Sequence, residues 1–495
     1  MIRRRFPLTK SIKSIWNDKR NNYPERIVQF GEGNFLRGFV DWQVDRMNKR
    51  AGFRSSVAIV QPRANGTVSK LNDQDGLYTL FLQGLKNGSA ISEHTVIEAV
   101  SRGIDPYKEY GEYIKLAENP ELRFIFSNTT EAGIAFAPDD KLTDTPQSSF
   151  PGKLTALLYH RFQYFNGSKE KGVIIIPCEL IDRNGDELKK IVLQFASLWN
   201  LGGEFTNWLE EYNVFCSSLV DRIVPGYPKD SISEITEELG YEDRLVVVGE
   251  QYHLWVIEGP AWLKAELPVE EAGLNTLIVD DMTPFRSRKV RILNGAHTAM
   301  TPISFLCKKE TVGEAMLDGQ IGEFVRELIF NEIIPTLDLP KAELTAYADE
   351  IVDRFLNPYI THYVMDISLN SISKFKTRDL PTLLEFVNRK EHLPQKLVFS
   401  LSALIYFYKG KRGDEQIMLR DDDSILTFFH EQWSTVDGSQ SSMHTFVQNV
   451  LQEKMLWEQD LSELAGLVET ITNHLMMMEH TGMRKALQAC LENTH

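Results

Sequence analysis

Cysteine is scarce in this sequence. Its 495 residues include four cysteines, Cys178, Cys216, Cys307 and Cys490, and no two of them form a C-x-x-C pair. This spacing excludes a disulfide framework and a cysteine-rich zinc site, and it is typical of a reducing compartment. No other metal-ligand spacing is present either. We therefore expect no metal site and a cytoplasmic location.

Long apolar runs are also absent. The longest, near residues 403–408, is far shorter than the roughly 20 residues that a membrane-spanning helix needs. The basic N-terminus lacks the apolar segment of a secretion signal. We expect neither a membrane partner nor a signal peptide.

Basic residues are outnumbered. The chain has 54 Lys and Arg against 69 Asp and Glu, which gives a net charge of −15. A nucleic-acid-binding function is not expected on this background, because nucleic-acid affinity depends on basic side chains. An anionic small-molecule substrate is still compatible with a local basic pocket. The length predicts more than one core, and the sequence leaves monomer and homo-oligomer open.

A strand, a glycine turn and a helix follow one another near the N-terminus. Residues 26–30 form a short β-type run, Gly31 and Gly33 follow in a Gly-x-Gly turn, and an amphipathic helix extends to about Asn48. Such a turn lets backbone amides approach a pyrophosphate at the helix N-terminus. Leu36 stands where a third glycine is usual, so the pattern also fits an ordinary tight turn.

Three further strands are expected in the N-terminal half. Residues 56–60, 122–128 and 173–177 are apolar runs that end in polar segments. After the first of them, dinucleotide-binding proteins usually place an acidic residue for the ribose, whereas this chain has Gln61 followed by Pro62 and Arg63. The polar ends are ligand sites or plain loops, and both NAD and NADP remain open.

The segment 283–297 predicts a helix that begins with Thr283 as N-cap and Pro284 in its first turn. At about 100° per residue, Lys289 shares its side of the helix with Asn294 and His297. An amine on this partly apolar face would be desolvated, which suits it to proton transfer. A cationic helix with a core histidine fits the same pattern.

After residue 283 the periodicity becomes helical. Acidic, proline- and glycine-rich joints separate the expected helices. We predict two domains, residues 1–280 with an α/β dinucleotide-binding fold and residues 281–495 with a mainly helical fold. The expected helices are 321–334, 341–355, 380–388, 394–408, 443–451 and 461–477.

Two motifs carry a resemblance to a known family. The order Lys-x4-Asn-x2-His within KVRILNGAH, and the turn Gly-x-Gly-x-Phe-x-Arg-x-Phe, resemble signatures of the mannitol and polyol long-chain dehydrogenase family. The likeness extends over nearly the whole chain. It implies an N-terminal Rossmann-like domain, a helical C-terminal substrate domain, and hydride transfer with NAD as cofactor.

The resemblance also assigns roles to residues. Lys289 would be the general acid/base, and Asn294 and His297 would polarise the reacting oxygen. Many family members have an asparagine for this oxygen where this chain has Leu180, and they have an arginine where it has Asp366. The residues that would bind the cofactor are Gly31, Gly33, Asn34, Phe35, Leu36, Gln61, Thr130 and Glu131.

Four residues are candidates for the substrate. Arg286 falls beside Lys289 on the helical wheel, and a guanidinium suits a carboxylate. Lys374 matches a substrate lysine of the family. Asp221, in a segment like the family's Val-Asp-Arg-Ile, either adjusts the charge of the lysine or forms a structural pair, and His362 is either a site or a core residue.

These features favour an oxidoreductase of an open-chain sugar acid. A mannonate or mannitol oxidoreductase of the same family is the first alternative. A sugar-acid-binding protein without turnover is an alternative of another class, and an epimerase that uses lysine and bound NAD is a third.

Overall fold

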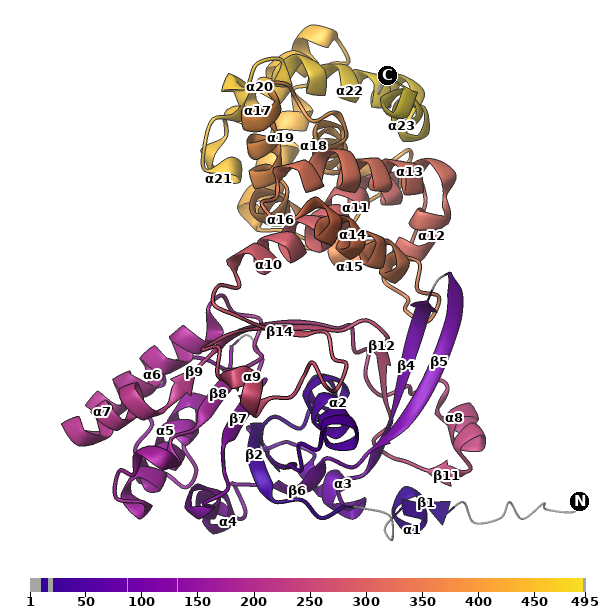
Figure 1. Cartoon of the computed structure of the whole chain (residues 1–495). Helices are drawn as coiled ribbons and strands as arrows, with labels where there is room; N and C mark the ends of the chain where they lie inside the picture. Colours follow the sequence, from indigo (N-terminus) through magenta and orange to yellow (C-terminus); the bar gives the residue numbers. More distant parts are fainter. Residues whose placement is uncertain (1–9, 17–20, 87, 131, 493–495) are drawn as a thin grey trace, which may run out of the picture. The chain divides into compact units, whose positions relative to one another are not determined.

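The computed structural model describes residues 10–16, 21–86, 88–130 and 132–492. The chain divides into two compact units, residues 1–84 with 91–282 and residues 283–495 with the short segment 85–90. The first unit is α/β and the second is mainly helical (Figure 1). This confirms the predicted fold class.

A six-stranded parallel sheet is the centre of the first unit. Its strand order is β6-β3-β2-β7-β8-β9, with β2, the first of these six strands along the chain, in the middle. This is the order of a doubly wound dinucleotide-binding sheet, whose ligands bind where the order reverses. The strands are β2 (Glu25–Phe30), β3 (Ser56–Val60), β6 (Val100–Ile104), β7 (Phe124–Ser127), β8 (Ile174–Pro177) and β9 (Val214–Phe215).

Both faces of this sheet are buried. Ile27 and Val57 pack into a core cluster on one face, and the next residues, Val28 and Ala58, pack into another cluster on the opposite face. Alternate strand residues point to opposite faces, so a strand covered on both sides must be apolar throughout. The helices that supply these layers are α2 (Asn34–Ala51), α4 (Tyr110–Lys115), α5 (Phe150–Tyr164), α6 (Asn184–Leu198) and α7 (Gly203–Tyr212).

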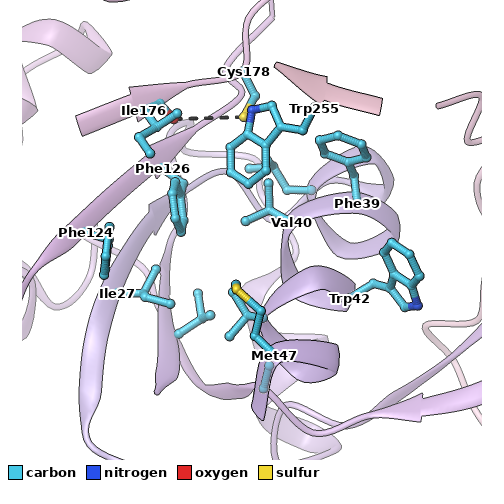
Figure 2. Packing of buried hydrophobic residues seen from close by; sticks show 14 of the residues in the cluster. Ile27, Phe39, Val40, Trp42, Met47, Phe124, Phe126, Ile176, Cys178 and Trp255 are labelled. Atoms are coloured by element: carbon cyan, nitrogen blue, oxygen red, sulfur yellow. Dashed lines mark hydrogen bonds between the residues drawn. The ribbon is translucent and has the colours of Figure 1, made fainter. Parts of the chain in front are cut away.

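Aromatic rings fill the core beside α2 (Figure 2). The indole of Trp255 lies 5.7 Å from the ring of Phe39 and 5.6 Å from that of Phe126. Burying each such side chain stabilises the fold by about 1.5–3 kcal/mol. The helix that follows the glycine turn is thereby fixed against the sheet.

The first unit also contains two three-stranded sheets, in the orders β10-β13-β14 and β12-β4-β5, and a two-stranded sheet of β1 and β11. The strands of these sheets and the short helices between them have the bounds β1 (Lys10–Ser11), α1 (Ile12–Trp16), α3 (Val68–Asp73), β4 (Tyr78–Lys86), β5 (Ser89–Ile97), β10 (Ser217–Asp221), α8 (Ile232–Leu239), β11 (Tyr241–Glu242), β12 (Val247–Glu250), β13 (Leu254–Glu258), α9 (Leu263–Glu266) and β14 (Thr276–Val279).

The second unit is a set of packed helices, with one short two-stranded ribbon at residues 411–416. The helices are α10 (Thr283–Arg288), a π-helix (Lys289–Gly295), α11 (Ala296–Leu306), α12 (Val312–Leu317), α13 (Gly319–Glu327), a second π-helix (Leu328–Ile333), α14 (Lys341–Phe355), α15 (Val364–Ile367), α16 (Ser371–Arg378), α17 (Leu380–Lys390), α18 (Gln395–Phe407), α19 (Asp423–Ser434), α20 (Gln440–Gln452), α21 (Lys454–Trp457), α22 (Leu467–Thr481) and α23 (Met483–Glu492).

In the part of the chain that the structure describes, no helix is long and apolar enough to cross a membrane. The same residues contain no group of three or more histidine, cysteine or acidic side chains that could hold a metal ion.

Candidate active site

The glycine turn between β2 and α2 has the backbone that a dinucleotide needs. Gly31 has φ +127°, and a Cβ there would lie 2.9 Å from the carbonyl oxygen of Asn128. Around Gly33 a Cβ would meet nothing within 4 Å. The first turn of α2 has no side-chain cap, so its N–H groups can face an anion. The turn therefore fits a pyrophosphate.

Two buried side chains support this turn from inside the domain. Gln29 donates to the carbonyl oxygen of Gly31 at 3.0 Å. Arg37 donates through Nε to the carbonyl oxygen of Glu32 at 3.1 Å and through a terminal nitrogen to Oδ1 of Asn34 at 2.7 Å. Because its guanidinium binds protein oxygens, Arg37 shapes the turn rather than presenting a charge to a phosphate.

Phe35 and Leu36 point toward the protein interior. The ring of Phe35 stacks on that of Phe39 at 5.1 Å, and Leu36 is buried in the core. Their contribution to a bound cofactor would therefore come from backbone N–H groups. Leu36 packs against Gly31, which explains a leucine where a third glycine is usual.

The polar residues after β3 and β7 meet at one edge of the sheet. Arg63, after β3, donates to Oγ1 of Thr130, after β7, at 3.2 Å. Gln61 is buried, and its amide donates to the carbonyl oxygens of Arg63 and Ala64 at 2.8 and 3.3 Å. Thr130 is thus placed at the point where the strand order reverses, and Glu131 lies outside the described residues.

The end of β8 holds the loop after β7 in place. The buried carboxylate of Glu179 accepts hydrogen bonds from the N–H and hydroxyl of Thr129 at 2.9 Å each and from Ser127 at 3.0 Å. Burial nevertheless raises the pKa of Glu179, against the effect of these hydrogen bonds. The next residue, Leu180, is 62% exposed and brings no hydrogen-bonding group to this edge.

Asp221 and Arg222 lie at the end of β10 in the first unit. Both are buried. Arg222 donates to the carbonyl oxygens of Gly38, Gln251 and Tyr252 and lies 4.0 Å above the ring of Trp42. Burial lowers the pKa of Arg222 to about 9. The side chain of Arg222 thus has a structural role, because it packs against α2. The role of Asp221 stays a prediction.

The segment of Lys289 is not the single α-helix that the sequence predicts. The α-helix starts at Thr283, one residue earlier than Thr283 as N-cap would give, and it widens to a π-helix over Lys289–Gly295 before α11 begins. A helical wheel with 3.6 residues per turn does not apply to this segment, because the hydrogen bonds of a π-helix join residues five apart. Short π-helices are frequent at functional sites. Lys289 and Asn294 are half-buried.

His297, at the start of α11, is buried among rings. It stacks on Phe355 at 4.2 Å and meets His362 edge-on at 4.9 Å. Burial lowers its pKa well below the usual value, and His362, Arg354 and Arg378 add to the effect. Within the described residues its Nε2 has no hydrogen-bond partner. A neutral imidazole with an unused nitrogen is suited to bind a substrate oxygen.

Cations gather near His297 in the second unit. Arg378 donates to the hydroxyl of Thr298 at 3.1 Å. Lys374, one turn earlier on α16, donates to the carbonyl oxygen of Ile367 at 2.7 Å, and its pKa is lowered by burial and then by Arg378. Arg354 and Arg378 are not among the site residues that the sequence predicts. The i, i+4 spacing of Lys374 and Arg378 was the available signal for the second of them.

Arg286 is half-buried, and burial lowers its pKa. Gly295 lies close to a side chain of this unit, because a Cβ there would lie 2.8 Å from Oδ1 of Asp379. Asp379 is buried, and burial raises its pKa well above the usual value. The side chain of Asp379 thus packs against the π-helix at Gly295.

Family models match both units. Residues 25–271 match the mannitol dehydrogenase Rossmann domain, and residues 281–479 match the mannitol dehydrogenase C-terminal domain. Among curated relatives, an altronate oxidoreductase of Bacillus subtilis (strain 168) is 53% identical, with 98% of this chain and 99% of the relative covered. An altronate oxidoreductase of Escherichia coli O139:H28 is 49% identical, with 94% and 97% covered.

Solved structures share the fold. A substrate-free D-sorbitol dehydrogenase matches with a TM-score of 0.77 at 21% identity, covering 94% of this chain and 95% of the other. A Pseudomonas fluorescens mannitol 2-dehydrogenase, in a ternary complex with NAD and D-mannitol, matches with a TM-score of 0.66 at 22% identity, covering 95% of both chains.

Together with the doubly wound first unit, the family models and these relatives show an oxidoreductase that acts on a CH–OH group. The chain belongs to the mannitol dehydrogenase family.

Proposed function

We propose that this protein interconverts D-tagaturonate and D-altronate with NAD as the cofactor. The observation that carries the proposal is the match to altronate oxidoreductases at 53% and 49% identity over nearly the whole chain. In this proposal the substrate would bind at the cations around His297, and the cofactor would bind at the glycine turn.

The glycine turn and the first turn of α2 would hold the dinucleotide through backbone N–H groups. A bound nicotinamide supplies the hydride in reduction and accepts it in oxidation. Thr130, at the edge of the sheet where the strand order reverses, would line this site.

Lys289 would act as the general acid in reduction and as the general base in oxidation. In reduction its ammonium group donates a proton to the alkoxide oxygen as that oxygen gains charge, and in oxidation the neutral amine takes the proton back. Asn294 and the neutral His297 would hydrogen-bond the same oxygen and stabilise its developing charge. The unused Nε2 of His297 supports this role.

The substrate's carboxylate would bind the cations of the second unit. Arg286 is the residue that the helical wheel favours, and Lys374 is the family's substrate lysine. Arg378 adds a guanidinium beside His297, and a guanidinium binds a carboxylate through two parallel hydrogen bonds. An uncharged polyol would not use this charge.

A substrate panel tests the proposal. Oxidation of NADH is followed by absorbance with D-tagaturonate, D-fructuronate and D-fructose in parallel, and the series is repeated with NADPH. We expect fast turnover of NADH with D-tagaturonate. A preference for D-fructuronate or D-fructose would replace the proposal with the mannonate or mannitol reaction, and no turnover with any of them would favour a binding protein or an epimerase.

A further inference from the structure

The position that usually recognises the adenosine ribose is occupied by a side chain that is already engaged. Gln61, directly after β3, stands where dinucleotide-binding folds usually place an acidic residue. It is buried, and its amide donates to the carbonyl oxygens of its own loop. A Cβ on Gly66 would lie 2.1 Å from the Gln61 side chain, so the loop is wrapped around it. The side-chain oxygen of Gln61 accepts a hydrogen bond from the backbone N–H of Val68 at 3.4 Å, so both ends of the Gln61 amide are engaged within the protein.

Another carboxylate reaches the same place from the glycine turn. Oε1 of Glu32 accepts a hydrogen bond from the backbone N–H of Thr67, in the loop between β3 and α3, at 3.1 Å. The backbone of Glu32 is fixed as well, because Arg37 donates to its carbonyl oxygen. Oε2 of Glu32 has no hydrogen-bond partner within the described part of the chain, and the residue is only half-buried.

The two segments that Glu32 connects are the ones between which the ribose lies in this fold. With the strand order β6-β3-β2-β7, the ribose of a bound dinucleotide sits between the Gly-x-Gly turn and the end of the neighbouring strand β3. A carboxylate that spans this interval can accept hydrogen bonds from the ribose hydroxyls. It would also repel a phosphate attached to the 2′ oxygen.

We propose that Glu32, from within the glycine turn, takes the ribose-recognition role and makes the site selective for NAD over NADP. The proposal rests on the proposed use of a nicotinamide dinucleotide. Arg63 is the one basic residue of the β3 end that would favour a 2′-phosphate, and its guanidinium is turned to the hydroxyl of Thr130.

Direct binding tests the role without any sugar substrate. The intact protein is titrated with NADH and with NADPH, and binding is followed by the quenching of tryptophan fluorescence. Glu32→Gln keeps the shape and the acceptor for the Thr67 N–H but removes the charge, whereas Glu32→Ala removes both. Glu121→Gln, on an exposed loop of the same unit, is the matched control.

We expect the wild type and the control to prefer NADH. In Glu32→Gln the NADH affinity should fall by roughly tenfold, as for the loss of one charged hydrogen bond. Its NADPH affinity should rise, so that the preference shrinks by on the order of 100-fold, with the thermal midpoint unchanged. Glu32→Ala should lose NADH affinity at least as far.

An unchanged NADH-to-NADPH ratio in both variants, a wild type that prefers NADPH, or a wild type that binds neither would overturn the assignment. A failure of the proposed substrate is a separate result. In that case NADH binding and its dependence on Glu32 persist, while D-tagaturonate is not reduced.

Discussion

Asp41 is an unusual group to find beneath the glycine turn, because it is a fully buried acid with weak partners. Its Oδ2 accepts long hydrogen bonds from Gln29 at 3.4 Å and from Tyr78 at 3.3 Å. Its Oδ1 and the side-chain oxygen of Gln29 are buried acceptors with no donor within the described residues. Burial raises the pKa of Asp41 from 3.8 to about 7.

The consequence is a loss of stability as pH rises. Between about pH 4 and pH 7 the folded protein keeps the proton on Asp41 while the unfolded chain has lost it. Since the folded state then binds more protons, the free energy of unfolding falls with pH and becomes level above pH 7. At about 1.4 kcal/mol per pH unit, the loss from this group is about 4 kcal/mol at pH 8.

Asp41→Asn removes the charge with little change of shape, and its amide can donate where the carboxylate cannot. The variant should match the wild type near pH 4, and its advantage should grow to about 4 kcal/mol at pH 8. Asp139→Asn, at an exposed aspartate, is the control.

Denaturant unfolding at half-unit pH steps from 5 to 8.5, followed by tryptophan fluorescence, measures the difference in the free energy of unfolding between variant and wild type. Between pH 5 and 7 that difference should increase by about 2 kcal/mol. A difference that stays flat across this range would refute the reasoning, because it would mean that Asp41 is not protonated in the folded protein.

Three further results are expected. Lys289→Met should lower kcat by about 10²- to 10⁴-fold, measured by NADH oxidation, and should leave NADH binding intact; near-normal turnover would remove the lysine from the mechanism. Gly31→Ala should weaken NADH binding by about tenfold in a fluorescence titration, because a Cβ would lie 2.9 Å from the carbonyl oxygen of Asn128 at a positive φ. Arg378→Gln and Arg286→Ala should each raise KM for the sugar acid by about 10- to 100-fold and leave an uncharged ketose unaffected; equal losses on both substrates would assign the arginine to structure instead.

Much of the fold follows from local patterns. The strand at 56–60 matches β3 residue for residue, and the helix at 341–355 matches α14. A sheet buried on both faces requires apolar runs, and an amphipathic helix requires apolar residues every three or four positions. Both patterns are formed by residues that are close together in the sequence. Strands and helices can therefore be predicted from them without knowledge of tertiary contacts.

The site depended on information that is distributed along the chain. The π-helix of Lys289 breaks the period on which a helical wheel relies. Arg354 and Arg378 reach His297 from helices far along the sequence, and only packing brings them there. Likewise, no local sequence pattern predicts that the Gln61 side chain binds the backbone of its own loop, or that the Glu32 carboxylate binds the backbone N–H of Thr67.

If the proposed function is right, the protein oxidises the hydroxyl of a sugar acid to a ketone with NAD. The most direct measurement incubates it with D-altronate and NAD and determines both the NADH formed and the product by NMR. We expect one NADH for each D-tagaturonate formed. An isomeric acid formed without net NADH, or no product at all, would contradict it.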